Sequence, residues 1–285
     1  MSVDQFAMAS TLETQPPAQS SYILSYPAPH VLLITINRPT RMNSLPYASH
    51  WEAEGLMSWF DAEPSLRVAV VTGAGEKAFS AGQDLIEQGE TKKKPLARQM
   101  MMHPPSGFMA ISRRTGKKPV IAAVNGFALG GGFEIVLGCD MVVASPTASF
   151  GLPEAKRGLY AGAGGLSRLV RITGLPIATE IAVAGRVLTA SEAFRFNIIN
   201  KVSVTPATLI DETIALAASI GDMSPDAVIV TRSGLRESLE QGSVERASQI
   251  TQDKFGRALA VAPNMMIGLE AFAKKQKPNW VPSKL

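Results

Sequence analysis

The chain has 285 residues, 46% of them hydrophobic, which is enough for one large domain or two small ones around a substantial core. Its formal net charge of +4 would attract polyanions in general but selects none, and no nucleic-acid function is expected from charge alone. The longest apolar runs, such as residues 120–124, are far shorter than the roughly 20 residues of a membrane-spanning helix, so no membrane span is predicted.

Cysteine and histidine content argues against a metal site. Cys139 is the single cysteine, and His30, His50 and His103 are scattered without motif context. No Cys/His cluster at metal-ligand spacing results, so no metal is expected. The histidines are interpreted as structural or surface residues, and Cys139 as a small core residue.

The amino-terminal half alternates strands and helices. A loose Gln/Pro/Ser leader covers residues 1–21, a β-branched strand covers residues 31–36, and an amphipathic helix covers residues 47–61. Continuous apolar strands follow at residues 68–72, 120–124 and 141–144. Such runs are typical of parallel strands buried on both faces, which predicts an α/β fold.

The carboxyl-terminal part is predicted to be mainly helical. Helical patterns cover residues 178–184, 190–196, 209–220 and 244–259, and only residues 200–204 resemble an extended piece. The expected division is a leader at 1–21, a core at 22–205, a helical region at 206–277 and a tail at 278–285.

The tail ends in Ser283-Lys284-Leu285. This tripeptide at the extreme terminus is the signal read by the peroxisomal import receptor. The two prolines before it, Pro278 and Pro282, suggest a tail that a receptor could reach. Import into the peroxisome matrix is therefore expected.

Two glycine clusters invite a phosphate-binding interpretation. Gly73-Ala74-Gly75 follows a strand, but Ala78 stands where the third glycine would be and no long helix follows, which argues against a dinucleotide site. Residues 162–165 lack a preceding strand and are interpreted as a close-packed turn. The Lys92-Lys93-Lys94 run has no interleaved aromatics and is interpreted as a solvated charge run.

Two other segments together predict a catalytic site. Residues 79–85 read FSAGQDL, and residues 123–134 read AVNGFALGGGFE. In the second, three glycines run into a helix that opens near Glu134, so bare backbone N–H groups would face an anion at the positive helix end.

With these segments the sequence resembles the crotonase, or enoyl-CoA hydratase/isomerase, superfamily from about residue 31 to residue 277. The resemblance is an ordered set of motifs: Arg38-Pro39 with Asn43-Ser44-Leu45, residues 79–85, residues 118–134, Cys139-Asp140, residues 150–154 and residues 162–165. It implies a spiral of ββα units, a helical trimerisation region, and a homotrimer or hexamer.

The resemblance also implies the chemistry, which is stabilisation of an enolate formed from an acyl-CoA thioester. Glu134 would activate water and Glu154 would donate a proton to the α-carbon, while the backbone N–H groups of Gln83 and Gly131 would form the oxyanion hole. No metal, flavin or nicotinamide is expected, because backbone dipoles stabilise the enolate, and coenzyme A enters only as part of the substrate.

By the same resemblance the substrate's CoA would lie along one loop and nearby groups. The candidates are Arg41, Ala78, Ser80, Ala81, Gly82, Asp84, Leu85, Gly130 and Lys275, the last supplied by a neighbouring subunit. Asn197 stands where the family usually has glycine, and asparagine also tolerates a left-handed backbone. The Met100-Met101-Met102 run is expected to line a helix over the acyl pocket or to fill core gaps.

Three alternatives stay open. A Δ3,Δ2-enoyl-CoA isomerase would share the enolate but needs one base, and the retained pair Glu134 and Glu154 argues against it. A dehydratase of a hydroxylated or branched acyl-CoA, as in some fungal relatives, would share every motif. A non-catalytic or RNA-binding homologue would have no reason to keep both glutamates and Gly131.

Overall fold

The computed structural model describes residues 12–92 and 103–285, and the Met100–Met102 run lies outside them. Two sheets form the core. The larger has the order β1-β2-β3-β5-β7-β10, with parallel pairing except between β1 and β2, and the smaller has the order β4-β6-β8-β9. The apolar runs predicted as strands are confirmed as β2 (Val31–Ile36), β3 (Val68–Gly73), β5 (Val120–Val124) and β7 (Met141–Ala144).

The chain repeats one unit three times, in agreement with the predicted ββα spiral. Each repeat gives one strand to the large sheet, one short strand to the small sheet, and then a helix. The repeats are β3, β4 (Ala78–Ser80) and α3 (Leu85–Lys92), then β5, β6 (Phe127–Leu129) and α4 (Gly131–Gly138), then β7, β8 (Ser149–Gly151) and α5 (Gly165–Thr173).

The remaining elements extend this frame. Before the repeats come β1 (Tyr22–Ala28) and α2 (Tyr47–Ala62), and after them α6 (Leu175–Ala182), β9 (Val187–Thr189), α7 (Ala190–Arg195) and β10 (Lys201–Val202). The carboxyl-terminal helices are α8 (Leu209–Gly221), α9 (Pro225–Glu240), α10 (Val244–Thr251), α11 (Arg257–Leu259) and α12 (Pro263–Ala273). Asn197 has a φ of +59°, so the turn before β10 is left-handed as predicted.

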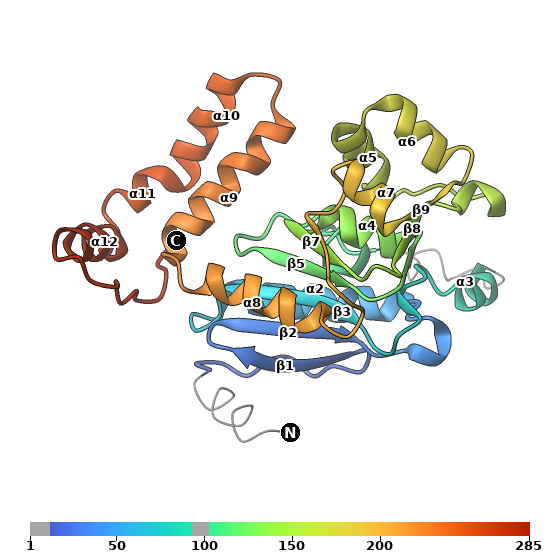
Figure 1. Cartoon of the computed structure of the whole chain (residues 1–285), viewed down its shortest axis with the longest axis horizontal. Coiled ribbons are helices and arrows are strands. Elements are labelled where there is room, and N and C mark those ends of the chain that lie inside the picture. Colours follow the sequence, from blue (N-terminus) through green and yellow to red (C-terminus); the bar gives the residue numbers. More distant parts are fainter. Residues whose placement is uncertain (1–11, 93–102) are drawn as a thin grey trace.

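Two apolar cores hold the layers together. The larger one packs residues of both sheets against helices that include α2 and α4, and it contains the fully buried Phe60, Phe79, Phe133 and Phe150. The smaller one lies between the large sheet and α8, and includes Val68, Ile121 and Ala217. Figure 1 shows α8 running along the large sheet while α9 to α12 extend away from the body.

An ion-pair cluster attaches α9 to the body. Asp140 accepts hydrogen bonds from Arg232 Nε at 2.9 Å and from Arg236 Nη2 at 2.7 Å. These side chains are largely buried, at 11 to 20% exposure. Because Asp140 directly precedes β7, the cluster joins α9 to the start of an inner strand of the large sheet.

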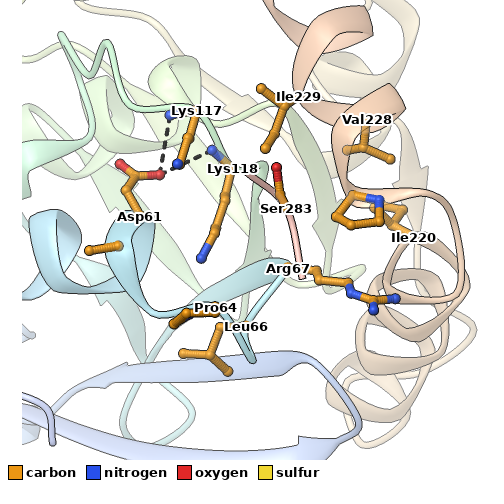
Figure 2. A pocket seen from close by; sticks show the side chains of 12 residues that line it. Asp61, Pro64, Leu66, Arg67, Lys117, Lys118, Ile220, Val228, Ile229 and Ser283 are labelled. Atoms are coloured by element: carbon orange, nitrogen blue, oxygen red, sulfur yellow. Dashed lines mark hydrogen bonds between the residues drawn. The ribbon is translucent and has the colours of Figure 1, made fainter. Parts of the chain in front are cut away.

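The terminal segments lie against the body. The backbone N–H groups of Glu13 and Thr14 donate to the Glu63 carboxylate at 3.0 and 2.8 Å, so this part of the expected leader contacts the end of α2. At the other end, Ser283 lies among Arg67, Lys117 and Ile229 (Figure 2). Ser283 Oγ donates to Asp226, and Lys117 Nζ donates to the backbone carbonyl of Leu285.

No single helix among residues 12–92 and 103–285 is long and apolar enough to cross a membrane, and only α8 and α9 taken together, bent by 107°, meet the length and composition requirements.

Candidate active site

A cavity of about 600 Å³ brings the predicted catalytic residues together. Its floor holds Glu134 and Glu154, and its walls include Gln83, Gly131 and Phe108. The lining comes from residues 41–47 before and at the start of α2, from the first two repeats, from the loop after β8 and from the turn before α5. Segments that lie more than a hundred residues apart in the sequence therefore meet in one space.

Glu134 projects from the first turn of α4 and is 4% exposed. Its Oε1 accepts 2.9 Å hydrogen bonds from the backbone N–H groups of Ala163 and Gly165. Burial, with a smaller contribution from the charge of Glu154, raises the pKa of Glu134 to about 7 against the opposing effect of these two donors. Such a carboxyl can exchange a proton near neutral pH.

The second glutamate reaches the cavity from the 3-10 turn that follows β8. The Oε2 atom of Glu154 is buried and has no hydrogen-bond partner among the described residues. Burial raises the pKa of Glu154, and Arg157 opposes that rise in part. An added Cβ at Gly130 would lie 3.1 Å from Glu154 Oε1, so the glycine keeps this carboxyl close to the start of α4.

Two backbone N–H groups fit the predicted oxyanion hole. Neither Gln83 N–H nor Gly131 N–H has an acceptor among the hydrogen bonds of the described residues. Gly82 has a φ of +89° and lies where the chain segments after β4 and β6 come close together. An added Cβ at Gly82 would lie 2.9 Å from Gly131 N. Unpaired donors at the mouth of a cavity are what a developing thioester oxyanion requires.

The predicted CoA-binding residues divide into two groups. Arg41, Ala81, Asp84, Leu85 and Gly130 line the cavity. Ala78 and Ser80 are buried instead, and both bind Asn43: Ala78 O accepts from its Nδ2 at 2.7 Å, and Ser80 Oγ donates to its carbonyl at 2.8 Å. These two residues and Gly82 support the loop but do not line the cavity.

Asp84 and Lys275 need separate comment. Asp84 pairs with Arg38 at 3.2 Å and accepts from Ile86 N–H at the start of α3, so much of its carboxylate is engaged. Lys275 follows α12, on the opposite side of the chain from α3 in Figure 1. Its expected contact with CoA, across a subunit boundary, stays a prediction.

One feature of the cavity was not predicted from the sequence. The side chain of Gln83 contacts His50 and His103, with each histidine Nε2 lying 3.1 Å from Gln83 Oε1. The three residues occur in three separate segments with no motif spacing. The only available signal was a glutamine where the family often has alanine.

Comparison with known proteins agrees with this geometry. Residues 28–283 match the family model described as enoyl-CoA hydratase/isomerase. The chain belongs to this family. Among solved structures, an enoyl-CoA hydratase of Bacillus anthracis superposes with a TM-score of 0.83 at 31% identity, covering 93% of this chain and all of that one.

Curated relatives of this enoyl-CoA hydratase/isomerase family member have more specific names. A mevalonyl-coenzyme A hydratase of Aspergillus fumigatus is 44% identical over 94% of this chain and 98% of its own length. One from Beauveria bassiana is 42% identical, over 96% of this chain and all of its own. A carnitinyl-CoA dehydratase of Escherichia coli O157:H7 is 37% identical over 88% of this chain and 94% of its own. The chain is thus an enzyme of the CoA hydratase, or hydro-lyase, type.

Proposed function

We propose that the enzyme adds water to a 2-enoyl-CoA, or removes it from a 3-hydroxyacyl-CoA, with Glu134 and Glu154 as its acid/base pair. The observation that carries the proposal is their meeting in one cavity beside the unpaired N–H groups of Gln83 and Gly131. Hydration needs one group at the β-carbon and one at the α-carbon, and two carboxyls supply both.

The surroundings of the two carboxyls support one assignment of roles. Two backbone donors on Glu134 favour its ionised form, so it suits a base, whereas the partnerless Oε2 of Glu154 favours a protonated carboxyl. In hydration, Glu134 takes a proton from water as the water oxygen bonds to the β-carbon. Glu154 then gives its proton to the α-carbon, and the electron pair of the enolate forms the new C–H bond.

The thioester oxygen carries the negative charge between these steps. The N–H groups of Gln83 and Gly131 would hold it, and loss of one such donor costs about 10²- to 10³-fold in rate in other enzymes. Dehydration runs the same steps backwards, with Glu154 taking the α-proton and Glu134 protonating the departing hydroxyl. No other group is needed to balance the reaction.

The named relatives support a substrate more polar than a simple fatty acyl chain. Mevalonyl-CoA carries hydroxyl groups and a methyl branch, and carnitinyl-CoA carries a hydroxyl and a cationic group. We therefore propose a short, branched or hydroxylated acyl-CoA, with mevalonyl-CoA and its 2-enoyl form as the first pair to test.

Assembly and location are further parts of the proposal. Exposed apolar side chains gather on the carboxyl-terminal helices, including Leu235, Leu239, Leu269 and Phe272 at 51 to 86% exposure. Exposed apolar surface of this kind is typical of a subunit interface, which supports a trimer or hexamer. The Ser283-Lys284-Leu285 tail supports a peroxisomal location and recognition by the import receptor.

The test is hydration of crotonyl-CoA and of 5-hydroxy-3-methylpent-2-enoyl-CoA. The reaction is monitored as loss of the enoyl-thioester absorbance, and the product is identified. Glu134→Gln and Glu154→Gln should each lower kcat by about 10²-fold or more. Glu245→Gln, a matched change on exposed α10, should not. A wild-type enzyme that only shifts the double bond of a 3-enoyl-CoA would overturn the proposal in favour of an isomerase.

A further inference from the structure

Gln83 lines the catalytic cavity, and the amide group of its side chain is only partly hydrogen-bonded. Its Nε2 atom is buried and has no hydrogen-bond partner among the described residues. Leaving a buried amide donor unpaired destabilises a protein, because the donor has lost its hydrogen bonds to water. An unpaired group at this position therefore needs a physical explanation, and a cavity beside it offers a ligand.

The orientation of the amide follows from His50. The backbone N–H of Met109 donates to His50 Nδ1 at 3.2 Å, so that nitrogen is an acceptor. Burial lowers the pKa of His50 to about 3, and the ring is neutral with its proton on Nε2. His50 Nε2 must therefore donate to the Gln83 atom 3.1 Å away, and that atom is the amide oxygen.

His103 fixes the same orientation from a second side. Its Nε2 lies 3.1 Å from the same Gln83 oxygen, and burial also lowers the pKa of His103. The rings of His50 and His103 meet edge to face with their centroids 4.6 Å apart. The centroids of the His50 and Phe108 rings are 4.2 Å apart. Two donors and packed aromatic rings thus fix the amide oxygen, and the buried NH₂ group is left without a partner in a residue that lines the cavity.

The position of the group relates it to the acyl chain. The main-chain N–H of Gln83 is the proposed donor to the thioester oxygen, so its side chain begins where the reacting carbons lie. Tyr47, His103 and Phe108 line the cavity there. A saturated hydrocarbon tail would leave the Gln83 NH₂ unpaired, whereas an oxygen on the acyl chain would accept its hydrogen bond.

We propose that the Gln83 side chain is a specificity-determining donor that selects acyl-CoA substrates with a hydroxyl or carbonyl oxygen beyond the reacting double bond. The assignment rests on the proposed hydratase function and adds to it the residue that recognises the acyl group. His50 and His103 are positioning residues, since they act on the substrate only through the Gln83 amide.

The experiment compares two substrates that differ only in one hydroxyl, 5-hydroxy-3-methylpent-2-enoyl-CoA and 3-methylpent-2-enoyl-CoA. The readout is the ratio of their kcat/KM values, because a disturbed Gln83 backbone would lower both rates together. The wild-type ratio should favour the hydroxylated substrate by about 10-fold or more, and Gln83→Met should remove about 10- to 100-fold of that preference.

Two further variants sharpen the result. Gln249→Met makes the same chemical change on the exposed face of α10, outside the cavity, and should leave the ratio unchanged. His103→Phe removes one of the two donors to the amide oxygen and should lower the ratio by a smaller factor than Gln83→Met.

A wild-type ratio near one, or a ratio that Gln83→Met leaves intact, would overturn the assignment while the hydratase function stands. Inactivity of the folded wild-type enzyme on both substrates and on crotonyl-CoA would instead overturn the proposed function, and the assignment with it.

Discussion

The backbone N–H of Gly165 donates a 2.9 Å hydrogen bond to Oε1 of Glu134, although the two residues lie 31 positions apart in the sequence. An added Cβ at Gly165 would lie 2.6 Å from Glu134 Cγ. The first turn of α5 therefore sets the position of a proposed catalytic carboxyl on α4 and leaves no space for a side chain of its own.

Gly165→Ala is accordingly expected to displace Glu134 and to lower kcat for hydration by about 10²-fold, the usual cost of a misplaced catalytic group. Gly55→Ala is the matched control, because no atom lies within 4 Å of its added Cβ in α2. That variant should keep its activity and gain about 1 kcal/mol of stability. Equal rates for the two variants would contradict this prediction.

Glu134→Gln should stabilise the protein at alkaline pH. The folded-state pKa of Glu134, about 7, exceeds the ordinary carboxyl value, so ionisation of Glu134 destabilises the fold, fully so above pH 7. This penalty vanishes as the pH falls toward the pKa that Glu134 has in the unfolded chain. A neutral amide oxygen can still accept from Ala163 and Gly165. We expect a gain of up to about 3 kcal/mol near pH 8, and almost none near pH 4, by urea unfolding. A gain independent of pH would be inconsistent with this origin.

The hydration rate should fall as pH drops through about 7. Glu134 must be ionised to take a proton from water, and its pKa is raised first by burial and also by Glu154. In Glu154→Gln the second contribution is absent, so the residual activity should decline at a lower pH than in the wild type. Profiles of kcat/KM from roughly pH 5 to 9 would report the two midpoints. Coincident midpoints would show that Glu154 does not influence Glu134.

Asp140→Asn should destabilise the protein by roughly 3 kcal/mol, because it leaves two largely buried arginines of α9 without their carboxylate. The comparison is Glu240→Gln, which removes an exposed partner of Arg171 and should cost less than about 1 kcal/mol. Thermal unfolding of both variants checks the difference. Equal losses would mean that burial of the Asp140 cluster adds nothing.

The proposed recognition of the terminal tripeptide by the import receptor is expected to require release of the tail from the body. Asp226 accepts from Ser283, and Lys117 donates to the carbonyl of Leu285. Asp226→Ala should therefore raise the affinity of the folded enzyme for the peroxisomal import receptor severalfold, measured by titration. A free peptide with the tail sequence, which is the same for the wild type and for Asp226→Ala, serves as the control and should bind the receptor with one affinity. Unchanged affinity of Asp226→Ala would mean that the docked tail does not hinder recognition.

The strands of the large sheet could be predicted from the sequence for a physical reason. Strands such as residues 68–72 and 120–124 are buried on both faces, so they appear as nearly continuous apolar runs without polar alternation. Glu134 and Glu154 lie in two of the motifs that carry the resemblance to the family. The structure brings these motifs into one cavity, while their individual roles stay proposals.

Other features gave weaker signals. The three-residue strands of the small sheet are too short for a periodic pattern, and β1 contains Pro27. Helix α9 was not singled out, although Ser224 and Pro225 mark its start as N-cap and first residue. The Gln83 contacts with His50 and His103 could not be predicted, because they depend on how separate loops meet in space.

Gly82 has a consequence for how this enzyme can change. The separation of the two proposed oxyanion donors follows from the pairing of β4 with β6 and from a glycine too close to Gly131 N to be replaced. That spacing is a property of the main chain. The carboxyls and the Gln83 amide are side chains that point into the same space. New substrates or reaction outcomes can therefore arise by exchanging side chains around a main-chain oxyanion site that stays the same.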